Sequence, residues 1–216
     1  MLTCGDDQDK ALDLYKLNIQ VSQALYPLLS VLEIALRNAI DRELSKYFQD
    51  NRWLLTQRHK FANHINLTRK DHKGNIVSDH FFTDKLHKAE EKLNFREVPI
   101  AHEKLLAELT FGFWIKFFDA GPIKILRGVP LQAFVNKPPI KLASVHSHLN
   151  SIVALRNRIA HSEPVCFDKS GKLCLQSLVA YEKNISDTLG WIDADLQAWT
   201  EKLNFFKPVY ARIASI

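Results

Sequence analysis

The feature that most constrains the fold of this 216-residue chain is the apolar pattern of residues 9–48. Apolar side chains recur there every three or four positions, at Leu12, Tyr15, Ile19, Leu25, Leu29, Leu32, Leu36, Ile40 and Leu44. This spacing predicts a helix, and further apolar residues beside the stripe predict that the helix is covered on several sides. Pro27 lacks a backbone N–H, so we expect it to kink this helix or to divide it into two.

The rest of the chain predicts further helices separated by turns. Helical periodicity covers residues 83–93, 100–118, 142–160 and 175–203, the last as one or two helices. Gly112 interrupts an apolar stripe, which predicts that a neighbouring helix packs closely there. Turn residues occupy 71–75 and 167–172, and the second turn suits one small hairpin. We therefore predict an all-α bundle of about five to seven helices in a single domain, residues 1–216.

Several classes of protein are disfavoured by what the sequence lacks. The acidic N-terminus does not resemble a secretory signal, and no run of about 18 apolar residues is present to span a membrane. Cys4, Cys166 and Cys174 have no metal-ligand spacing; Cys166 and Cys174 could face each other across a hairpin, but we expect buried free thiols. The histidines are scattered and no glycine-rich phosphate loop is present. We expect a cytoplasmic protein without a metal or nucleotide cofactor.

The positive charges of the chain are placed unevenly, although the net charge is only +5. Residues 120–162 contain no Asp or Glu and carry Lys124, Arg127, Lys137, Lys141, Arg156 and Arg158. A second basic run has a single acid, Asp71, among Arg52, Arg58, Lys60, Arg69, Lys70 and Lys73. Such runs suit a polyanionic partner such as RNA. The alternative is a solvated surface that acidic residues elsewhere, such as Asp187 and Glu201, compensate.

The residues best suited to chemistry lie at the expected end of the helix over residues 142–160. They are Arg156, Asn157, Arg158 and His161, followed by Ser162, Glu163 and Pro164. Arg156 stays protonated, so it can bind a scissile phosphate. His161 can act as a general base or acid, and Asn157 can hold the imidazole or a phosphate oxygen. Arg158 points away from Asn157, which suits contact with the substrate backbone or a partner subunit.

RNA is the natural substrate for such a set, because its 2′-hydroxyl supplies an internal nucleophile and no metal is needed. One histidine covers only one of the two proton transfers, so a symmetric dimer would supply the second. The structural alternative is an arginine paired with an acid and a histidine that caps a helix.

The Arg-x4-His pattern of Arg156 and His161 resembles the signature of the HEPN superfamily. Residues 32–38 (LEIALRN) and 108–114 (ELTFGFW) resemble its Abi-like, or abortive infection, branch. In the first stretch Glu33 and Arg37 can pair on a helix, or can line the site together with Asn38. The family's recurring Glu-x3-Arg-Asn pattern supports the second possibility. The aromatic residues of the second stretch are expected to pack in the core rather than to stack on bases.

The resemblance implies a single Abi-like HEPN domain that acts as a homodimeric, metal-independent endoribonuclease. It implies anti-phage abortive infection or a toxin system, with RNA as substrate and an antitoxin or phage-derived trigger as a further partner. Arg156, Asn157 and His161 would be catalytic. Arg158, Lys124, Arg127 and Lys141 would bind RNA. The first alternative is a non-catalytic module of the same fold that binds RNA or an antitoxin. The second is a purely structural helical interaction protein.

Overall fold

The computed structural model describes residues 7–168, 170 and 172–215, which form ten α-helices, four 3-10 helices and two short strands. The predicted all-α class is confirmed, but the predicted number of helices is too low. Residues 100–118 break into α4 (His102–Glu108), α5 (Phe111–Ile115) and the 3-10 helix η2 (Lys116–Phe118). Residues 53–56 and 120–125 also form short helices, α2 (Trp53–Thr56) and α6 (Ala120–Ile125). Gly112 marks no close approach, because a Cβ there would meet nothing within 4 Å.

The chain divides into two compact units. One comprises residues 1–35 and 134–216, and the other comprises residues 36–133. The first helix, α1 (Gln8–Phe48), begins in the former and ends in the latter. We call them the motif unit, because it contains residues 156–161, and the aromatic unit. The prediction of a single domain is not tested by this division.

Helix α1 is one continuous element of 41 residues with Pro27 inside it, so of the two predicted effects of Pro27, division into two helices is excluded. Its buried face includes Val21, Leu25 and Leu32, which have no exposed surface. The N-terminal part of the predicted stripe is instead exposed, with Leu12 at 56% and Tyr15 at 65%. By length and composition α1 would also pass as a membrane-spanning helix, as core helices of soluble proteins do.

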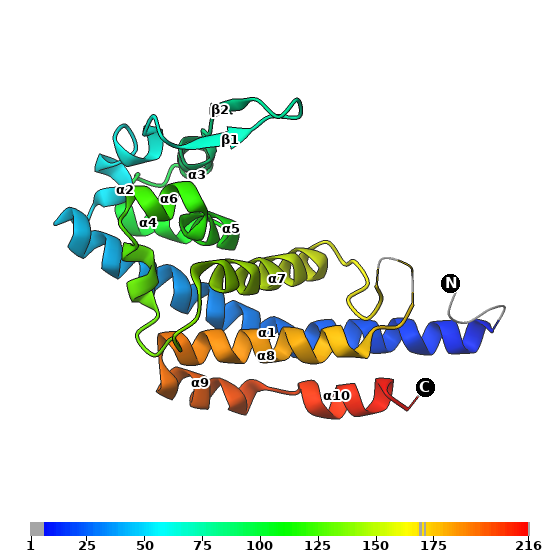
Figure 1. The fold of residues 1–216 in the computed structure, drawn as a ribbon. Coiled ribbons are helices and arrows are strands. Elements are labelled where there is room, and N and C mark those ends of the chain that lie inside the picture. Colours follow the sequence, from blue (N-terminus) through cyan, green and yellow to red (C-terminus); the bar gives the residue numbers. More distant parts are fainter. Residues whose placement is uncertain (1–6, 169, 171, 216) are drawn as a thin grey trace. The chain divides into compact units, whose positions relative to one another are not determined.

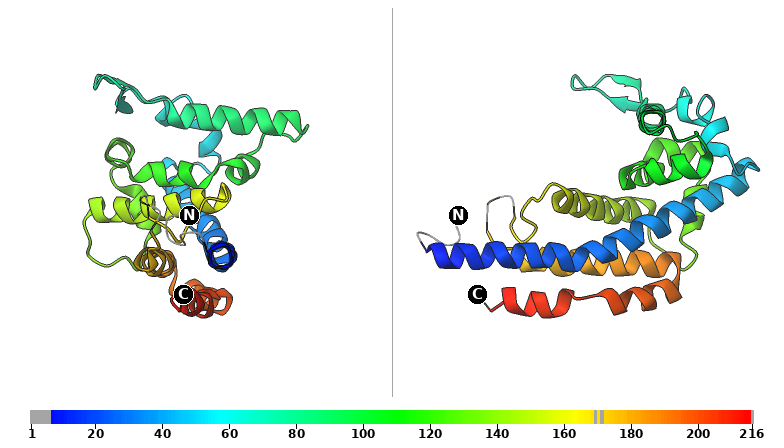
Figure 2. Two further views of the ribbon diagram at one scale, coloured as in Figure 1. Left: turned by 90° about the vertical axis from the view of Figure 1, so that its right-hand side faces the viewer. Right: turned by 180° about the vertical axis from the view of Figure 1, so that it is seen from behind.

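The motif unit is a bundle in which α7 (Leu142–Ala160) packs on α8 (Leu175–Ile192), with both alongside α1 (Figures 1 and 2). α9 (Ala194–Thr200), the 3-10 helix η4 (Glu201–Leu203) and α10 (Phe206–Ile213) complete the unit, and α9 and α10 pack on α8. Helix α7 buries a stripe at helical spacing, Val145, Leu149, Ile152 and Leu155. This burial fixes the direction in which α7 carries residues 156–161.

The aromatic unit contains the C-terminal part of α1 and all elements up to residue 133. Besides α2, α4, α5, η2 and α6, it has α3 (Phe81–Phe95) and the 3-10 helices η1 (Phe61–Asn63) and η3 (Val129–Ala133). Strands β1 (Thr68–Lys70) and β2 (Ile76–Ser78) flank the predicted turn at 71–75, which is confirmed. The strands themselves were not predicted.

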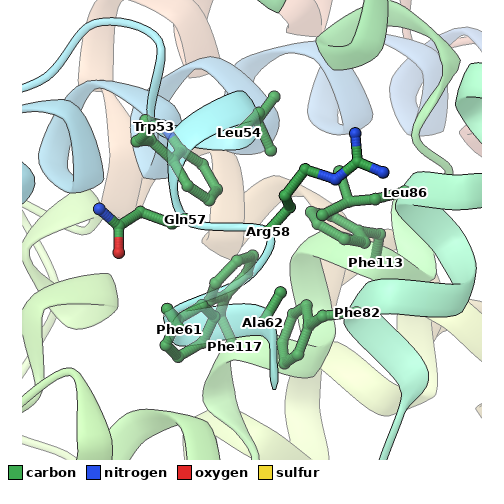
Figure 3. Close-up of a pocket in the computed structure, with 10 residues that line it drawn as sticks. All are labelled: Trp53, Leu54, Gln57, Arg58, Phe61, Ala62, Phe82, Leu86, Phe113 and Phe117. Carbon is green, nitrogen blue, oxygen red and sulfur yellow. The ribbon is translucent and has the colours of Figure 1, made fainter. Parts of the chain in front are cut away.

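The core of the aromatic unit is a cluster of rings. Phe82 and Phe117 lie 4.7 Å apart between ring centroids, and Phe113 packs edge-on against both. Figure 3 shows a small cavity among these rings, with Arg58 at its edge. Its volume of about 10 Å³ leaves room for about one water molecule, so it is a packing gap rather than a ligand site. The prediction that residues 111–114 pack in the core is confirmed for Phe111, Phe113 and Trp114.

One carboxylate on α1 joins two other helices of the aromatic unit. Asp41 Oδ1 accepts a hydrogen bond from Trp53 Nε1 at 2.7 Å and lies 2.9 Å from His102 Nε2. Trp53 and His102 are both buried. Because these donors have lost water, Asp41 must satisfy them.

We expect Asp41→Ala to lower the free energy of unfolding by roughly 2–4 kcal/mol, because it leaves two buried donors without an acceptor. Urea unfolding measures this loss. Asp13→Ala is the matched control on the same helix, because Asp13 forms an exposed pair with Lys16 and should contribute about 0.5 kcal/mol or less. Equal effects of the two substitutions would contradict the importance assigned to Asp41.

Candidate functional site

The end of helix α7 places His161 at the surface. His161 is the C-cap residue, and the next residue, Ser162, has the left-handed backbone conformation with φ +56°. Ser162 N donates to Ile159 O at 3.1 Å, and Glu163 N donates to Arg158 O at 2.8 Å. These two bonds form a Schellman motif, which satisfies the last carbonyls of the helix and turns the chain away. His161 is therefore exposed at a defined point.

The segment after the motif is fastened to α1 by a residue that the sequence analysis missed. Asn18 is buried, and its Oδ1 accepts hydrogen bonds from Val165 N at 2.8 Å and Cys166 N at 3.2 Å. Both donors belong to buried residues. The only signal for Asn18 in the sequence is a polar residue among the apolar residues of α1.

Arg158 also holds the segment after the motif. Its Nη2 donates to the backbone oxygen of Pro164, and to that of Phe167 at 3.0 Å. The prediction that Arg158 contacts RNA is untested. Its guanidinium is already engaged within the chain.

Arg156 and Glu33 form an ion pair between α7 and α1. Arg156 Nε lies 3.6 Å from Glu33 Oε2, and the two side chains are 34% and 25% exposed. The ion pair that the sequence analysis considered for Glu33 was with Arg37. Arg37 Nε instead donates to Asn38 Oδ1 at 3.4 Å. The structure thus brings Glu33 to the motif, whereas Arg37 and Asn38 belong to the aromatic unit.

The arrangement leaves chemically useful groups accessible. Glu33 faces the Nε side of Arg156, and the Nη hydrogens of a half-exposed guanidinium can donate to an anion. His161 and Asn157 are both exposed. A cation and an imidazole at the end of one helix can bind a phosphate and move a proton.

A groove of about 460 Å³ borders this end of α7. Ile159, Ser162 and Glu163 form one wall, and the other is formed by Tyr15, Asn18, Ile19, Ser22, Gln23 and Tyr26 of α1. Tyr15 and Tyr26 are well exposed. The motif therefore lies beside an uncovered and largely apolar part of α1.

Of the basic residues predicted to bind RNA, Lys124, Arg127 and Lys141 are exposed, and Arg158 is partly buried. Lys141 is the N-cap and His161 the C-cap of α7, which is 19 residues long. A helix of that length separates its two ends by about 28 Å. Lys124 and Arg127 belong to the aromatic unit. Binding of RNA by Lys141 stays a prediction, and only an RNA of several nucleotides could contact it and His161 together.

The cysteines and acidic residues offer no second chemical centre within the described ranges. No group of three or more His, Cys, Asp or Glu side chains there could hold a metal ion. Cys166 and Cys174 are free, and burial raises the pKa of the Cys166 thiol to about 12. Cys4 lies outside the described residues. The small hairpin predicted after the motif is a single antiparallel bridge between Phe167 and Leu173.

Comparison with models of known protein families shows which family the chain belongs to. A family model described as Abi-like protein matches residues 4–166. The chain belongs to the Abi-like protein family. No match was found among curated proteins or among solved structures.

The Abi-like match covers the groups that build the candidate site. It includes Asn18, Glu33, Arg156 and His161, and it ends at Cys166, whose N–H Asn18 binds. Helices α8, α9 and α10 follow the matched region. The match thus coincides with the contacts that hold the end of α7 against α1.

Ser162 provides a test of how the end of α7 is built. A residue with a Cβ is strained at φ +56°, and glycine is not. We expect Ser162→Gly to raise the free energy of unfolding by roughly 0.5–1 kcal/mol in urea unfolding. Ser147→Gly, at an exposed position within α7, is the control and should lower it by a similar amount. Destabilisation by Ser162→Gly would contradict the left-handed cap.

Proposed function

We propose that this Abi-like protein is a metal-independent endoribonuclease of an abortive-infection or toxin system. Family membership supports the role in abortive infection. The observation that supports the chemistry is the half-exposed Arg156 and the exposed His161 at one helix end, which Glu33 and Asn18 hold in place. RNA in the cytoplasm is the substrate in this proposal.

The proposed reaction needs no group from outside the protein. His161 takes the proton of the ribose 2′-hydroxyl, and the 2′-oxygen attacks the adjacent phosphorus. The bond from phosphorus to the 5′-oxygen breaks, and that oxygen receives a proton. The products are a 2′,3′-cyclic phosphate and a 5′-hydroxyl. Arg156 stabilises the charge that develops on the phosphate, and Asn157 holds either the imidazole or a phosphate oxygen.

Glu33 is a positioning residue in this proposal. A free arginine side chain samples many rotamers, and the ion pair with Glu33 restricts Arg156. The pair also lowers the net positive charge offered to RNA. Glu33 therefore improves the geometry of Arg156 at some cost in its attraction for phosphate.

The second proton transfer calls for a second copy of His161, and α1 offers a surface for a dimer. Leu12, Tyr15, Ile19 and Tyr26 share one face of α1 and are exposed. This face runs for about 20 Å and borders the groove beside Ser162. A two-fold dimer through this face would bury exposed apolar surface and bring two motifs toward each other.

The catalytic proposal predicts that Arg156→Ala and His161→Ala each lower cleavage of single-stranded RNA by at least about 100-fold. Each should change the free energy of unfolding by about 1 kcal/mol or less, since neither side chain is buried. Cleavage is measured with EDTA present, and the ends of the products identify the reaction. His87→Ala, an exposed histidine on α3, is the control.

Full activity of either variant would show that the catalytic assignment is wrong. Unfolding of either variant would favour a structural role for the motif. Loss of activity in EDTA would exclude the metal-independent mechanism.

The dimer proposal predicts that the wild-type protein is a dimer and that Ile19→Lys with Tyr26→Lys makes it monomeric and inactive. Sedimentation equilibrium measures the mass. Trp199→Lys with Phe205→Lys is the matched control, because these exposed side chains of the motif unit lie outside α1, on α9 and at the N-cap of α10. A monomeric wild type that cleaves RNA, or a doubly substituted dimer, would contradict the proposal.

The ion pair of Arg156 with Glu33 favours one alternative, a non-catalytic module that binds RNA or an antitoxin. An arginine neutralised by a carboxylate contributes to stability without any reaction. RNA binding without cleavage, by a protein shown to be folded and dimeric, would support this alternative.

A further inference from the structure

The hairpin formed by β1 and β2 projects from the aromatic unit and has no packing function that would explain it. In Figures 1 and 2 it extends beyond the helices of its own unit. Thr68 pairs with Ser78, Arg69 with Val77 and Lys70 with Ile76. All six residues are exposed except Val77, which is half-buried. Ile76 is 73% exposed. A two-stranded hairpin without a buried face contributes little to stability.

The hairpin is nevertheless well ordered at its tip. Asp71 N donates to Asn75 O at 2.9 Å, and Asp71 Oδ1 accepts from Lys73 N and Asn75 N, both at 2.8 Å. These bonds hold the pKa of Asp71 below its usual value. Gly74 supplies the left-handed conformation, with φ +83°, that closes the turn.

The base of the hairpin is anchored to the unit. Asp79 N donates to Leu67 O at 2.7 Å, and Leu67 is buried. Asp79 Oδ2 also pairs with Lys116 at 2.9 Å. The hairpin is thus an ordered arm on a fixed base.

The side chains of the arm are strongly biased toward positive charge. Arg69, Lys70 and Lys73 are exposed on it, and His72 lies at the tip. The single acid, Asp71, is occupied by the hydrogen bonds of the turn. A narrow ribbon with three exposed cations and the exposed hydroxyl residues Thr68 and Ser78 can donate hydrogen bonds to successive phosphates of an extended nucleic-acid strand.

We infer that the β1–β2 hairpin is an arm that binds the phosphodiester backbone of RNA through Arg69, Lys70 and Lys73. This inference rests on the proposed function for its choice of ligand, but not on any cleavage step. The arm contacts phosphates rather than base edges, so it strengthens binding to all sequences alike.

The test compares two triple variants in a His161→Ala background, so that bound RNA is not cut. The arm variant is Arg69→Ser, Lys70→Ser and Lys73→Ser. The control is Lys88→Ser, Lys92→Ser and Lys104→Ser, which removes the same charge from exposed positions on helices of the same unit. Fluorescence anisotropy gives the affinity for a single-stranded RNA oligonucleotide at several salt concentrations, and a thermal melt confirms folding.

We expect the arm variant to reduce the slope of log K against log salt by about 2, because each phosphate contact contributes about 0.7 on a single strand. This corresponds to about 100-fold weaker binding at about 0.1 M salt. The control should stay within about threefold of the parent. The melting temperature of the arm variant should stay within about 2 °C of the parent, because the substituted side chains are exposed.

Equal binding by the arm variant and its parent, or an equal loss in arm and control variants, would overturn the inference. Loss of binding to anionic phosphatidylserine vesicles with RNA affinity unchanged would overturn it in favour of a membrane surface. A wild-type protein that binds RNA through the arm but does not cleave it would refute the nuclease and leave the arm standing. A protein that cleaves RNA, and whose RNA affinity is unchanged by the arm substitutions, would support the nuclease and refute the arm.

Discussion

The fold depends on covering α1. A 41-residue helix with apolar side chains on several faces is unstable alone in water, so other elements must bury those side chains. In the motif unit α7 and α8 lie alongside it, and in the aromatic unit Trp53 and His102 bind its Asp41. The polar residues of α1 acquire their importance from this packing, because a polar group on a covered helix must find a partner.

The sequence predicts where the candidate site lies better than it predicts the contacts that hold the site in place. The end of α7 at Arg156–His161 follows from periodicity and from Pro164, and the structure agrees. Asn18 was missed because apolar spacing shows which face is buried, not which buried position holds a backbone segment from the far end of the chain. Glu33 could pair with Arg37 four residues along the same helix, but in the structure it pairs with Arg156 of α7. Sequence spacing alone cannot show whether a glutamate pairs with an arginine on its own helix or with one on another helix.

The helix count was wrong where the sequence has weak periodicity. A long apolar run predicts a long helix well, because many residues contribute to one pattern. Between residues 49 and 134 the elements are mostly three to seven residues long, and tertiary contacts among aromatic rings decide their limits. The turn at Asp71–Asn75 was predictable from the sequence, but the two strands beside it were not. The three residues on each side, TRK and IVS, carry no alternation of apolar and polar character.

The bond between Asn18 and Val165 has a consequence for the order of events during synthesis. These residues are 147 positions apart, and the pair of Arg156 with Glu33 is of similar span. Helix α1 leaves the ribosome before α7, and the end of α7 cannot dock on it until residues up to Cys166 have been made. Until residue 156 has been made, a nascent chain contains neither Arg156 nor His161, so it holds α1 but no candidate site. For an enzyme that cuts RNA, this delay would spare the message and the ribosome that are producing it.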